Sequence, residues 1–126
     1  QIGMLHVAMS RAVRLVVDSG MHHKRWSREQ AVKYFVDNIG DAETSAITEI
    51  ERYCVWPGQA CSYMVGKITW MEGRERAKKA LGSKFDIRKF HDVVLSLGSV
   101  PLRVLERRID AFIADGGQGL EGVVYD

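Results

Sequence analysis

The stretch "ERYCVWPGQACSYMVGK", residues 51–67, places a helix break inside a strongly helical pattern. Pro57 and Gly58 end one periodic apolar segment, and another begins directly after them. Tyrosines stand on both sides of the break, at Tyr53 and Tyr63, with Gln59 between them. A helix junction needs only a stop signal and a start signal, so these aromatic and polar groups require a further explanation.

Helical periodicity continues from this break toward both ends of the chain, and strand alternation is almost absent. The segment "SREQ" at residues 27–30 is a capping box, and Gly20, Gly40, Gly82 and Gly98 are stop signals. The helices that this pattern predicts span about residues 2–19, 27–39, 41–56, 58–81, 86–97 and 101–114. We therefore expect an all-α fold, an antiparallel array of about six helices in one segment, residues 1–126, with a flexible Gly-rich tail over residues 115–126.

Composition excludes several classes of protein. The 126 residues are 46% hydrophobic and 27% charged, as is usual for one modest globular domain. A net charge of +2 is too small to indicate nucleic-acid binding. The basic run at residues 73–84 also holds acid, so we interpret it as a solvated helix face rather than an anion site. No apolar run is long enough to span a bilayer, and the sequence indicates neither a cytoplasmic nor an exported location.

The first predicted helix is apolar on nearly every side, which is typical of a buried helix. Its apolar residues are Met4, Leu5, Val7, Ala8, Met9, Ala12, Val13, Leu15, Val16 and Val17. A chain of 126 residues has little material with which to bury such a helix, and it begins without methionine. We therefore expect a fragment of a longer protein, in which a missing N-terminal part covers this helix, or a chain that self-associates through it.

The two cysteines, Cys54 and Cys61, flank the helix break. We expect two small buried hydrophobic residues rather than a disulfide or a metal pair, with Cys54 on the inner face of the third helix beside Ile47 and Ile50.

Polar groups on the first helix follow a helical spacing. Arg11, Arg14 and Asp18 share one face. The pattern fits a buried structural ion pair between Arg14 and Asp18. It equally fits a guanidinium group that faces a polar cleft and binds a carboxylate through two hydrogen bonds.

The fourth helix presents a second unusual face, with Gln59, Tyr63, Gly66 and Trp70 at helical spacing. The opposite stripe reads as core: Cys61, Met64, Val65, Ile68 and Met71. A glycine in mid-helix costs roughly 1 kcal/mol relative to alanine, so we expect a close approach at Gly66. Packing against another helix and contact with a ligand both satisfy that expectation.

Histidines do not form a metal site in this sequence. His22 and His23 follow the Gly20 stop, in a predicted loop, whereas catalytic zinc needs about three protein ligands. Neither His6 nor His91 belongs to an HExxH motif, and nucleophile elbows, phosphate loops and CxxC motifs are absent. We therefore expect no metal ligands and no complete catalytic constellation in this chain.

Three stretches resemble a known family. Residues 11–35, "RAVRLVVDSGMHHKRWSREQAVKYF", together with residues 51–67 and residues 79–113, are similar to the C-terminal part of the bacterial domain-of-unknown-function eight-eight-five family. Members of that family resemble zinc-dependent metallopeptidases of the gluzincin kind, and their HExxH-type zinc motif lies N-terminal to this region. The resemblance implies zinc and a peptide-like substrate for the full-length protein, but no metal in this chain.

The resemblance also implies roles for individual residues. Two cleft-lining segments of the family, "RLVVDTGxH" and "YxxxPGQAxxYxxG", match residues 14–22 and 53–66 here, with Ser19 in place of threonine and Met64 where lysine is common. The implied donors to an oxyanion are Tyr63, Tyr53 and His22, in that order.

Substrate binding is assigned by the same resemblance to Arg14 or Arg11, with Gln59 beside them. Two alternatives remain open: a non-catalytic helical interaction module that docks a partner through the first helix, and a metal-independent enzyme, for which the sequence offers no nucleophile–base pair.

Overall fold

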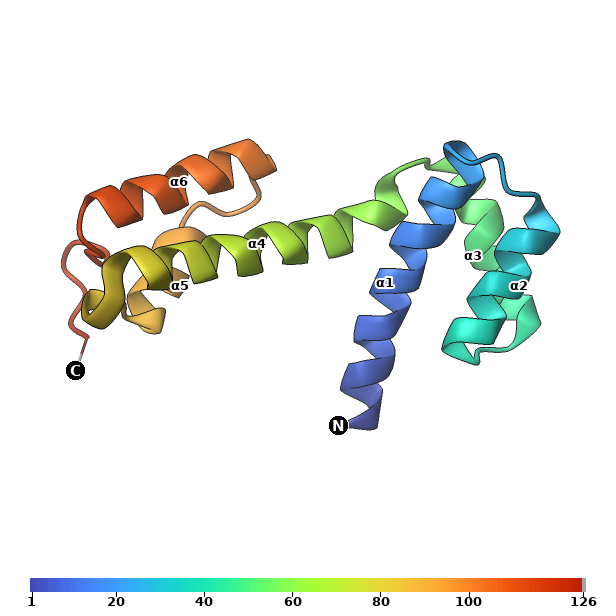
Figure 1. Ribbon diagram of the computed structural model, residues 1–126, viewed down its shortest axis with the longest axis horizontal. Coiled ribbons are helices and arrows are strands. Elements are labelled where there is room, and N and C mark those ends of the chain that lie inside the picture. Colours follow the sequence, from blue (N-terminus) through green and yellow to red (C-terminus); the bar gives the residue numbers. More distant parts are fainter. Residues whose placement is uncertain (126) are drawn as a thin grey trace. The chain divides into compact units, whose positions relative to one another are not determined.

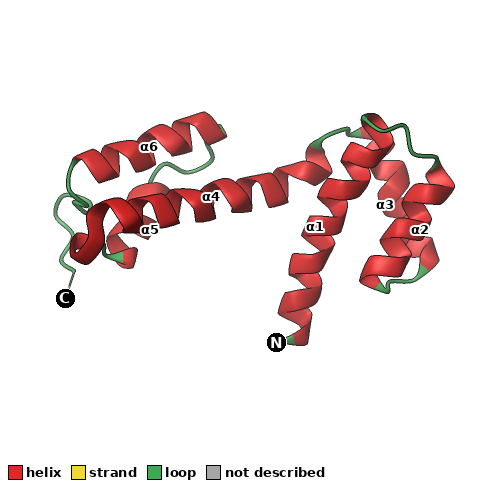
Figure 2. Cartoon of the chain, in the orientation of Figure 1, coloured by secondary structure: helices red, strands yellow, loops and turns green. Residues whose placement is uncertain are grey.

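The computed structural model describes residues 1–125. Its α-helices are α1 (Ile2–His22), α2 (Arg28–Ile39), α3 (Glu43–Val55), α4 (Gln59–Leu81), α5 (Ile87–Leu95) and α6 (Leu102–Ala114), with one 3₁₀ turn at Gly82–Lys84 (Figure 1). The described residues contain no strand, and short loops join the helices (Figure 2). The predicted all-α fold and the number of helices are confirmed. None of the described helices combines the length and the hydropathy needed to cross a membrane.

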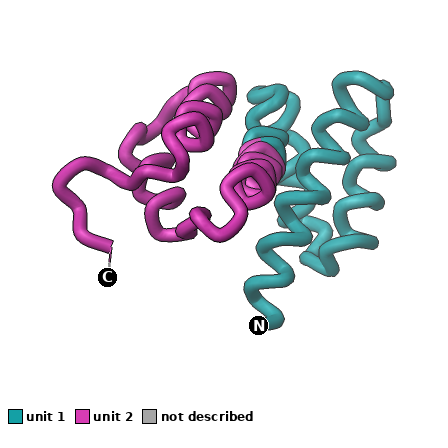
Figure 3. The backbone as a smooth tube through the Cα atoms, turned by 60° about the vertical axis from the view of Figure 1, so that its left-hand side comes forward, with its two compact units in different colours: residues 1–65 teal, residues 66–126 magenta. Residues whose placement is uncertain are grey.

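The chain divides into two compact units, Gln1–Val65 and Gly66–Asp126 (Figure 3). The boundary falls within α4, so this helix contributes its first turns to unit 1 and its remaining turns to unit 2. The candidate site residues that the sequence predicts all belong to unit 1.

Unit 1 packs α1 against α2 and α3 around its own apolar core. The buried core residues are Val13, Val17, Ala31, Val32, Phe35, Ala46, Ile50, Tyr53 and Ala60. The predicted capping box fixes the start of α2: the Ser27 hydroxyl accepts a hydrogen bond from Gln30 N, and the Gln30 side chain accepts one from Ser27 N. Gly40, at φ 79°, ends α2 as predicted.

Unit 2 has a separate core that joins the later turns of α4 to α5 and α6. Its buried residues are Ala77, Phe90, Val93, Val94, Leu105, Ile109 and Phe112. The Asp86 carboxylate accepts from Arg88 N at 2.8 Å and so caps α5. Gly73 faces Ile109 of α6 so closely that a Cβ atom there would collide with it. In the predicted flexible tail, Leu120 packs against this core.

The end of α1 differs from the prediction. Gly20 does not stop the helix, which continues to His22. The chain turns instead at Arg25, whose φ is 56°, and Trp26 N donates to Gly20 O at 3.0 Å. Gly20 is glycine because the Trp26 indole lies against it: a Cβ atom would be 2.5 Å from Trp26 Cε3.

The predicted positions of the cysteines are also wrong in part. Both thiols are free, but Cys54 is exposed and Cys61 is half-buried. The buried stripe of α3 runs through Ala46, Ile50 and Tyr53, so Cys54 lies just outside it.

The stripe of α4 that reads as core is not buried along its length, since Val65, Ile68 and Met71 are exposed. The helix buries mainly small residues, Ala60 in unit 1 and Ala77 in unit 2, and the stripe falls between these positions. The close approach expected at Gly66 is absent among the described residues, because no atom lies within 4 Å of a Cβ placed there.

Candidate functional site

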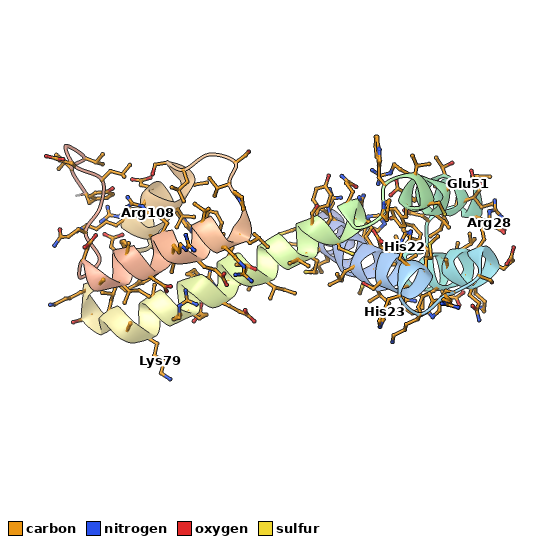
Figure 4. The ribbon with its side chains drawn as sticks, turned by 90° about the horizontal axis from the view of Figure 1, so that it is seen from above. His22, His23, Arg28, Glu51, Lys79 and Arg108 are labelled. Atoms are coloured by element: carbon orange, nitrogen blue, oxygen red, sulfur yellow. The ribbon has the colours of Figure 1, made fainter. Side chains whose placement is uncertain are left out.

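The face of α1 that contacts the end of α3 and the start of α4 carries four polar side chains. Arg11, Arg14 and Asp18 follow one another at the predicted helical spacing, and His22 extends the series because α1 continues through it. The prediction of a loop at His22 is therefore wrong. Figure 4 shows His22 and its neighbour His23 at the C-terminal end of α1.

Arg14 is the buried centre of the series, with only 8% of its surface exposed. Its Nη1 donates to Glu49 Oε2 at 3.3 Å, and its Nη2 donates to Gln59 Oε1 at 3.1 Å. The predicted pair between Arg14 and Asp18 is replaced by these contacts. The Nε atom of Arg14 is buried and has no hydrogen-bond partner among residues 1–125.

Glu49 gathers the donors around Arg14. Its Oε2 also accepts from Arg52 Nη2 at 2.7 Å and from the Tyr53 hydroxyl at 3.0 Å. Burial raises the pKa of the Glu49 carboxyl, but the hydrogen bonds from Arg52 and Tyr53 and the charges of Arg52 and Arg14 outweigh burial, so the pKa lies below its ordinary value. Glu49 is therefore a carboxylate at neutral pH and holds the guanidinium groups in place.

Tyr53 is a fully enclosed member of this group, with 1% of its surface exposed. Burial, together with the neighbouring Glu49 charge, raises the pKa of its phenol far above the usual range. Its hydroxyl donates a hydrogen bond to Glu49, and the side chain is not accessible to solvent.

Tyr63 has the opposite character, since 44% of its surface is exposed. The Arg11 guanidinium lies 4.0 Å from the centre of its ring, and that of Arg14 lies 4.9 Å away, which are cation–π distances. Its hydroxyl accepts from Gln59 Nε2 at 3.5 Å, the limit of a hydrogen bond. Within residues 1–125, the Arg11 guanidinium makes no hydrogen bond, so Arg11 and Tyr63 together present an unused cation and a phenol.

These residues form the polar cluster: Arg11, Arg14, Glu49, Arg52, Tyr53, Gln59 and Tyr63. A groove of about 320 Å³ adjoins it. The groove is lined by His6, Val7, Ser10, Arg11, Arg14, Phe35, Asp41 and Glu49. His6 Nε2 lies 3.1 Å from Asp41 Oδ1 across this groove.

Sequence reasoning missed Glu49 and Arg52, which organise the polar cluster. A signal was present, since Glu49 precedes Tyr53 by four residues and Arg52 by three, the spacings that bring side chains together on a helix.

Asp18 and His22 form a second polar centre one to two turns further along α1. Asp18 is 2% exposed, and its Oδ1 lies 2.8 Å from His22 Nδ1. The backbone N–H of Gly58 donates to Oδ2 at 3.0 Å and to Oδ1 at 3.2 Å, so Asp18 also fixes the start of α4. The structure therefore brings Arg11, Arg14, Tyr53, Gln59 and Tyr63 together. Among residues 1–125, His22 is linked to them through Asp18 and the Gly58–Gln59 backbone.

Neither polar centre is a metal site. Over residues 1–125, no group of three or more histidine, cysteine, aspartate or glutamate side chains is arranged to hold a metal ion. The chemistry that this region can supply is recognition of an anion by guanidinium groups, hydrogen bonding by a phenol, and proton exchange at an imidazole.

Comparisons with known proteins agree with this picture at the level of the fold. A family described as "Bacterial protein of unknown function (DUF885)" matches residues 1–109. The crystal structure of the "putative lipoprotein" from Colwellia psychrerythraea is similar to 90% of this chain, with 49% sequence identity and a TM-score of 0.87. The match covers 20% of that protein, so this chain spans about a fifth of its length. No curated protein matches the sequence.

Proposed function

The chain belongs to the bacterial DUF885 family, and from this premise we propose that it is the C-terminal cleft wall of a zinc-dependent hydrolase that acts on peptide-like substrates. In this proposal the chain supplies groups that bind and orient the substrate. Residues 1–125 do not fit a zinc ion, so the metal ligands would come from other parts of the full-length protein. Arg11 and Tyr63 would contact the substrate directly and would not bind the metal.

The observation that carries the proposal is the contact between the half-buried Arg11 and the exposed Tyr63 ring, beside the ion pairs of Glu49 with Arg14 and Arg52. Glu49 and Gln59 hold Arg14, whereas within residues 1–125 the Arg11 guanidinium makes no hydrogen bond and lies against the Tyr63 ring. The polar cluster contains three guanidinium groups against one carboxylate, that of Glu49, so it favours an anionic ligand group. A terminal carboxylate of a peptide has the planar two-oxygen geometry that guanidinium binds best.

Tyr63 would serve the reacting end of the substrate. Hydrolysis of an amide passes through a tetrahedral intermediate whose oxyanion needs hydrogen-bond donors already in position. The Tyr63 hydroxyl can donate because the Gln59 amide nitrogen, its hydrogen-bond partner among residues 1–125, uses it as an acceptor. The stacked guanidinium of Arg11 would keep the ring in place.

One observation favours a second candidate, a non-catalytic helical interaction module. The first half of α1 exposes a series of apolar side chains: Ile2, Met4, Leu5, Val7 and Met9. Such a surface is typical of a docking face. This candidate needs no substrate, so a test of hydrolysis separates the two.

The test uses the full-length protein and paired peptides that differ only in a free or an amidated C-terminus. Arg11→Gln should raise KM for the free peptide about 10-fold or more, because hydrogen bonds to charged groups contribute about 1.5–3 kcal/mol. KM for the amidated peptide should change little. Arg28→Gln is the matched control, since Arg28 is exposed on α2 and pairs with Glu51, both labelled in Figure 4.

Two outcomes would count against the proposal. Absence of peptide hydrolysis by the zinc-loaded full-length protein would reject the hydrolase and leave the interaction module. An equal rise in KM for both peptides would remove carboxylate binding from Arg11.

A further inference from the structure

The His22 imidazole has a defined proton position. Its Nδ1 lies 2.8 Å from Asp18 Oδ1 and 3.0 Å from the backbone carbonyl oxygen of Asp18. A carboxylate and a carbonyl oxygen can only accept hydrogen bonds, so Nδ1 is the nitrogen that carries the proton. In neutral His22 the other nitrogen, Nε2, therefore has a free lone pair.

Burial and hydrogen bonds fix the orientation of the Asp18 carboxylate toward His22. It is 2% exposed, and both of its carboxylate oxygens accept from the Gly58 N–H. Rotation of the carboxylate away from His22 would break its two short contacts with the exposed Gly58 N–H, which fix its orientation. The same carboxylate thus fixes the imidazole of α1 and the backbone at the start of α4.

The Nε2 atom is available to a ligand. The His22 side chain is 36% exposed, and within residues 1–125 no hydrogen bond involves its Nε2. Since the carboxylate binds one side of the ring and the other side is open, the arrangement has the form of a carboxylate–histidine pair that orients a base.

We propose that Asp18 is a positioning residue which makes His22 a proton acceptor toward the O–H group of a bound water or ligand hydroxyl. In this step the O–H bond breaks, the proton moves to Nε2, and the electron pair of the bond stays on the oxygen. The imidazolium that forms is stabilised by the Asp18 carboxylate. This inference deepens the proposed function and rests on it only for the reaction that the base would serve.

His22 then has a different role from the one that the family resemblance implies. A donor to an oxyanion needs a proton on Nε2, and neutral His22 has its proton on Nδ1 instead. The resemblance alone does not distinguish these roles, whereas the two acceptors at Nδ1 make Nε2 the accepting nitrogen of the neutral ring.

The direct test is nitrogen NMR of the full-length protein labelled at histidine, at a pH where His22 is neutral. The His22 signals are assigned by their loss in His22→Gln. We expect the chemical shift of a protonated nitrogen at Nδ1 and of an unprotonated nitrogen at Nε2. A main population with the proton on Nε2 would overturn the inference, whatever the enzymatic activity.

The second arm tests whether Asp18 sets the proton position. In Asp18→Asn, the amide oxygen is drawn to the Gly58 N–H, which turns the NH₂ group toward Nδ1, so the share of the Nδ1–H form should fall. In full-length enzyme with peptidase activity, kcat should fall with it by about 10²–10⁴, the usual contribution of a general base, while KM changes little. His23→Gln is the matched control at the adjacent imidazole.

The two proposals can fail separately. A folded Asp18→Asn protein with the wild-type proton position would remove the positioning role from Asp18. If Asp18→Asn does not fold, the wild-type NMR signals still decide the proton position. If the full-length protein hydrolyses no peptide, the hydrolase proposal fails while the NMR result stands.

Discussion

At the scale of single residues, the two tyrosines around the Pro57–Gly58 break have opposite environments. Tyr53 is 1% exposed and donates to Glu49, whereas Tyr63 is 44% exposed and stacks on Arg11. The sequence predicted both as candidates of one kind. Helical spacing identifies Glu49 as a possible acceptor for Tyr53, but solvent exposure depends on how α1, α3 and α4 pack, which spacing does not show.

The first prediction concerns Tyr63→Phe in the full-length protein and tests the proposed hydrolase. If the phenol donates to the oxyanion, kcat and kcat/KM should fall together by about 10²–10³, because the bond strengthens in the transition state. The melting temperature should change little, since the hydroxyl has one long hydrogen bond at 3.5 Å. Steady-state kinetics and thermal unfolding are measured on the same sample.

Tyr53→Phe is the matched control for this prediction. It removes a buried hydroxyl that donates to Glu49 at 3.0 Å, so it should cost about 1–3 kcal/mol of stability and leave kcat of the folded enzyme nearly unchanged. Unchanged kcat in Tyr63→Phe would contradict its role as oxyanion donor. A large loss of kcat in Tyr53→Phe at full stability would contradict a purely structural role for Tyr53.

The second prediction is a pH dependence of stability that originates at Glu49. Its pKa in the folded protein is lower than the unfolded value of 4.5, so its contribution is fully present above about pH 4.5. It is lost as pH falls from that value through the folded pKa. Urea unfolding between about pH 6 and pH 3 should therefore show a steeper acid loss in wild type than in Glu49→Gln.

Asp86 supplies a comparison in unit 2. The Arg88 side chain, through its hydrogen bonds, lowers the pKa of Asp86 to about 2, so Asp86→Asn should flatten the acid loss only below about pH 3.8. Identical pH profiles for wild type and Glu49→Gln would show that the guanidinium groups do not stabilise the Glu49 carboxylate.

At the scale of helices, local signals and tertiary contacts had different predictive value. The start of α2 at Ser27, its end at Gly40 and the start of α5 at Asp86 were predicted, because each depends on residues within three or four positions. The end of α1 was predicted wrongly, because Gly20 serves the packing of Trp26, six residues later.

The third prediction follows from that contact. Alanine in place of glycine in a helix normally gains up to about 1 kcal/mol. At Gly20 the new Cβ would lie 2.5 Å from Trp26 Cε3, and forcing the indole aside should cost about 1–3 kcal/mol, so Gly20→Ala should lower the free energy of unfolding.

Gly66→Ala is the control for the third prediction. Within the described residues, a Cβ atom at this position would have no atom within 4 Å. Urea unfolding of the 126-residue chain should therefore show a free energy of unfolding that is unchanged or raised by up to about 1 kcal/mol, the helix-propensity gain of alanine. A stabilised Gly20→Ala variant would mean that Trp26 does not pack against α1 as described.

At the scale of the whole molecule, apolar periodicity identified the helices but not how they divide between cores. The chain has two cores, and α4 contributes Ala60 to one and Ala77 to the other. The spacing of apolar residues along one helix gives no indication of such a division, because the spacing is the same whether the helix contacts one core or two. The exposure of Val65, Ile68 and Met71 therefore could not be predicted from their spacing.

The last prediction concerns the exposed apolar half of α1, which the sequence did predict in part. Met4 and Leu5 are 69% and 63% exposed and Val16 is 40% exposed, whereas Val13, at 4%, belongs to the core of unit 1. Burial of apolar area is worth about 25 cal/mol per Å², so this face should bind a hydrophobic dye and favour self-association of the 126-residue chain. Dye fluorescence and sedimentation at several concentrations measure both effects.

The matched variants separate this face from the core. Met4→Gln with Leu5→Gln should reduce dye binding and association while the melting temperature stays nearly constant, because both side chains are exposed. Val13→Ala should instead lower the melting temperature, since it leaves a cavity in the core of unit 1. In a full-length protein that covers this face, the dye signal of the face should be absent; about four fifths of the similar lipoprotein lies outside the matched region. A monomeric 126-residue chain that binds no dye would show that the face needs no cover, and would remove the structural support for the interaction module.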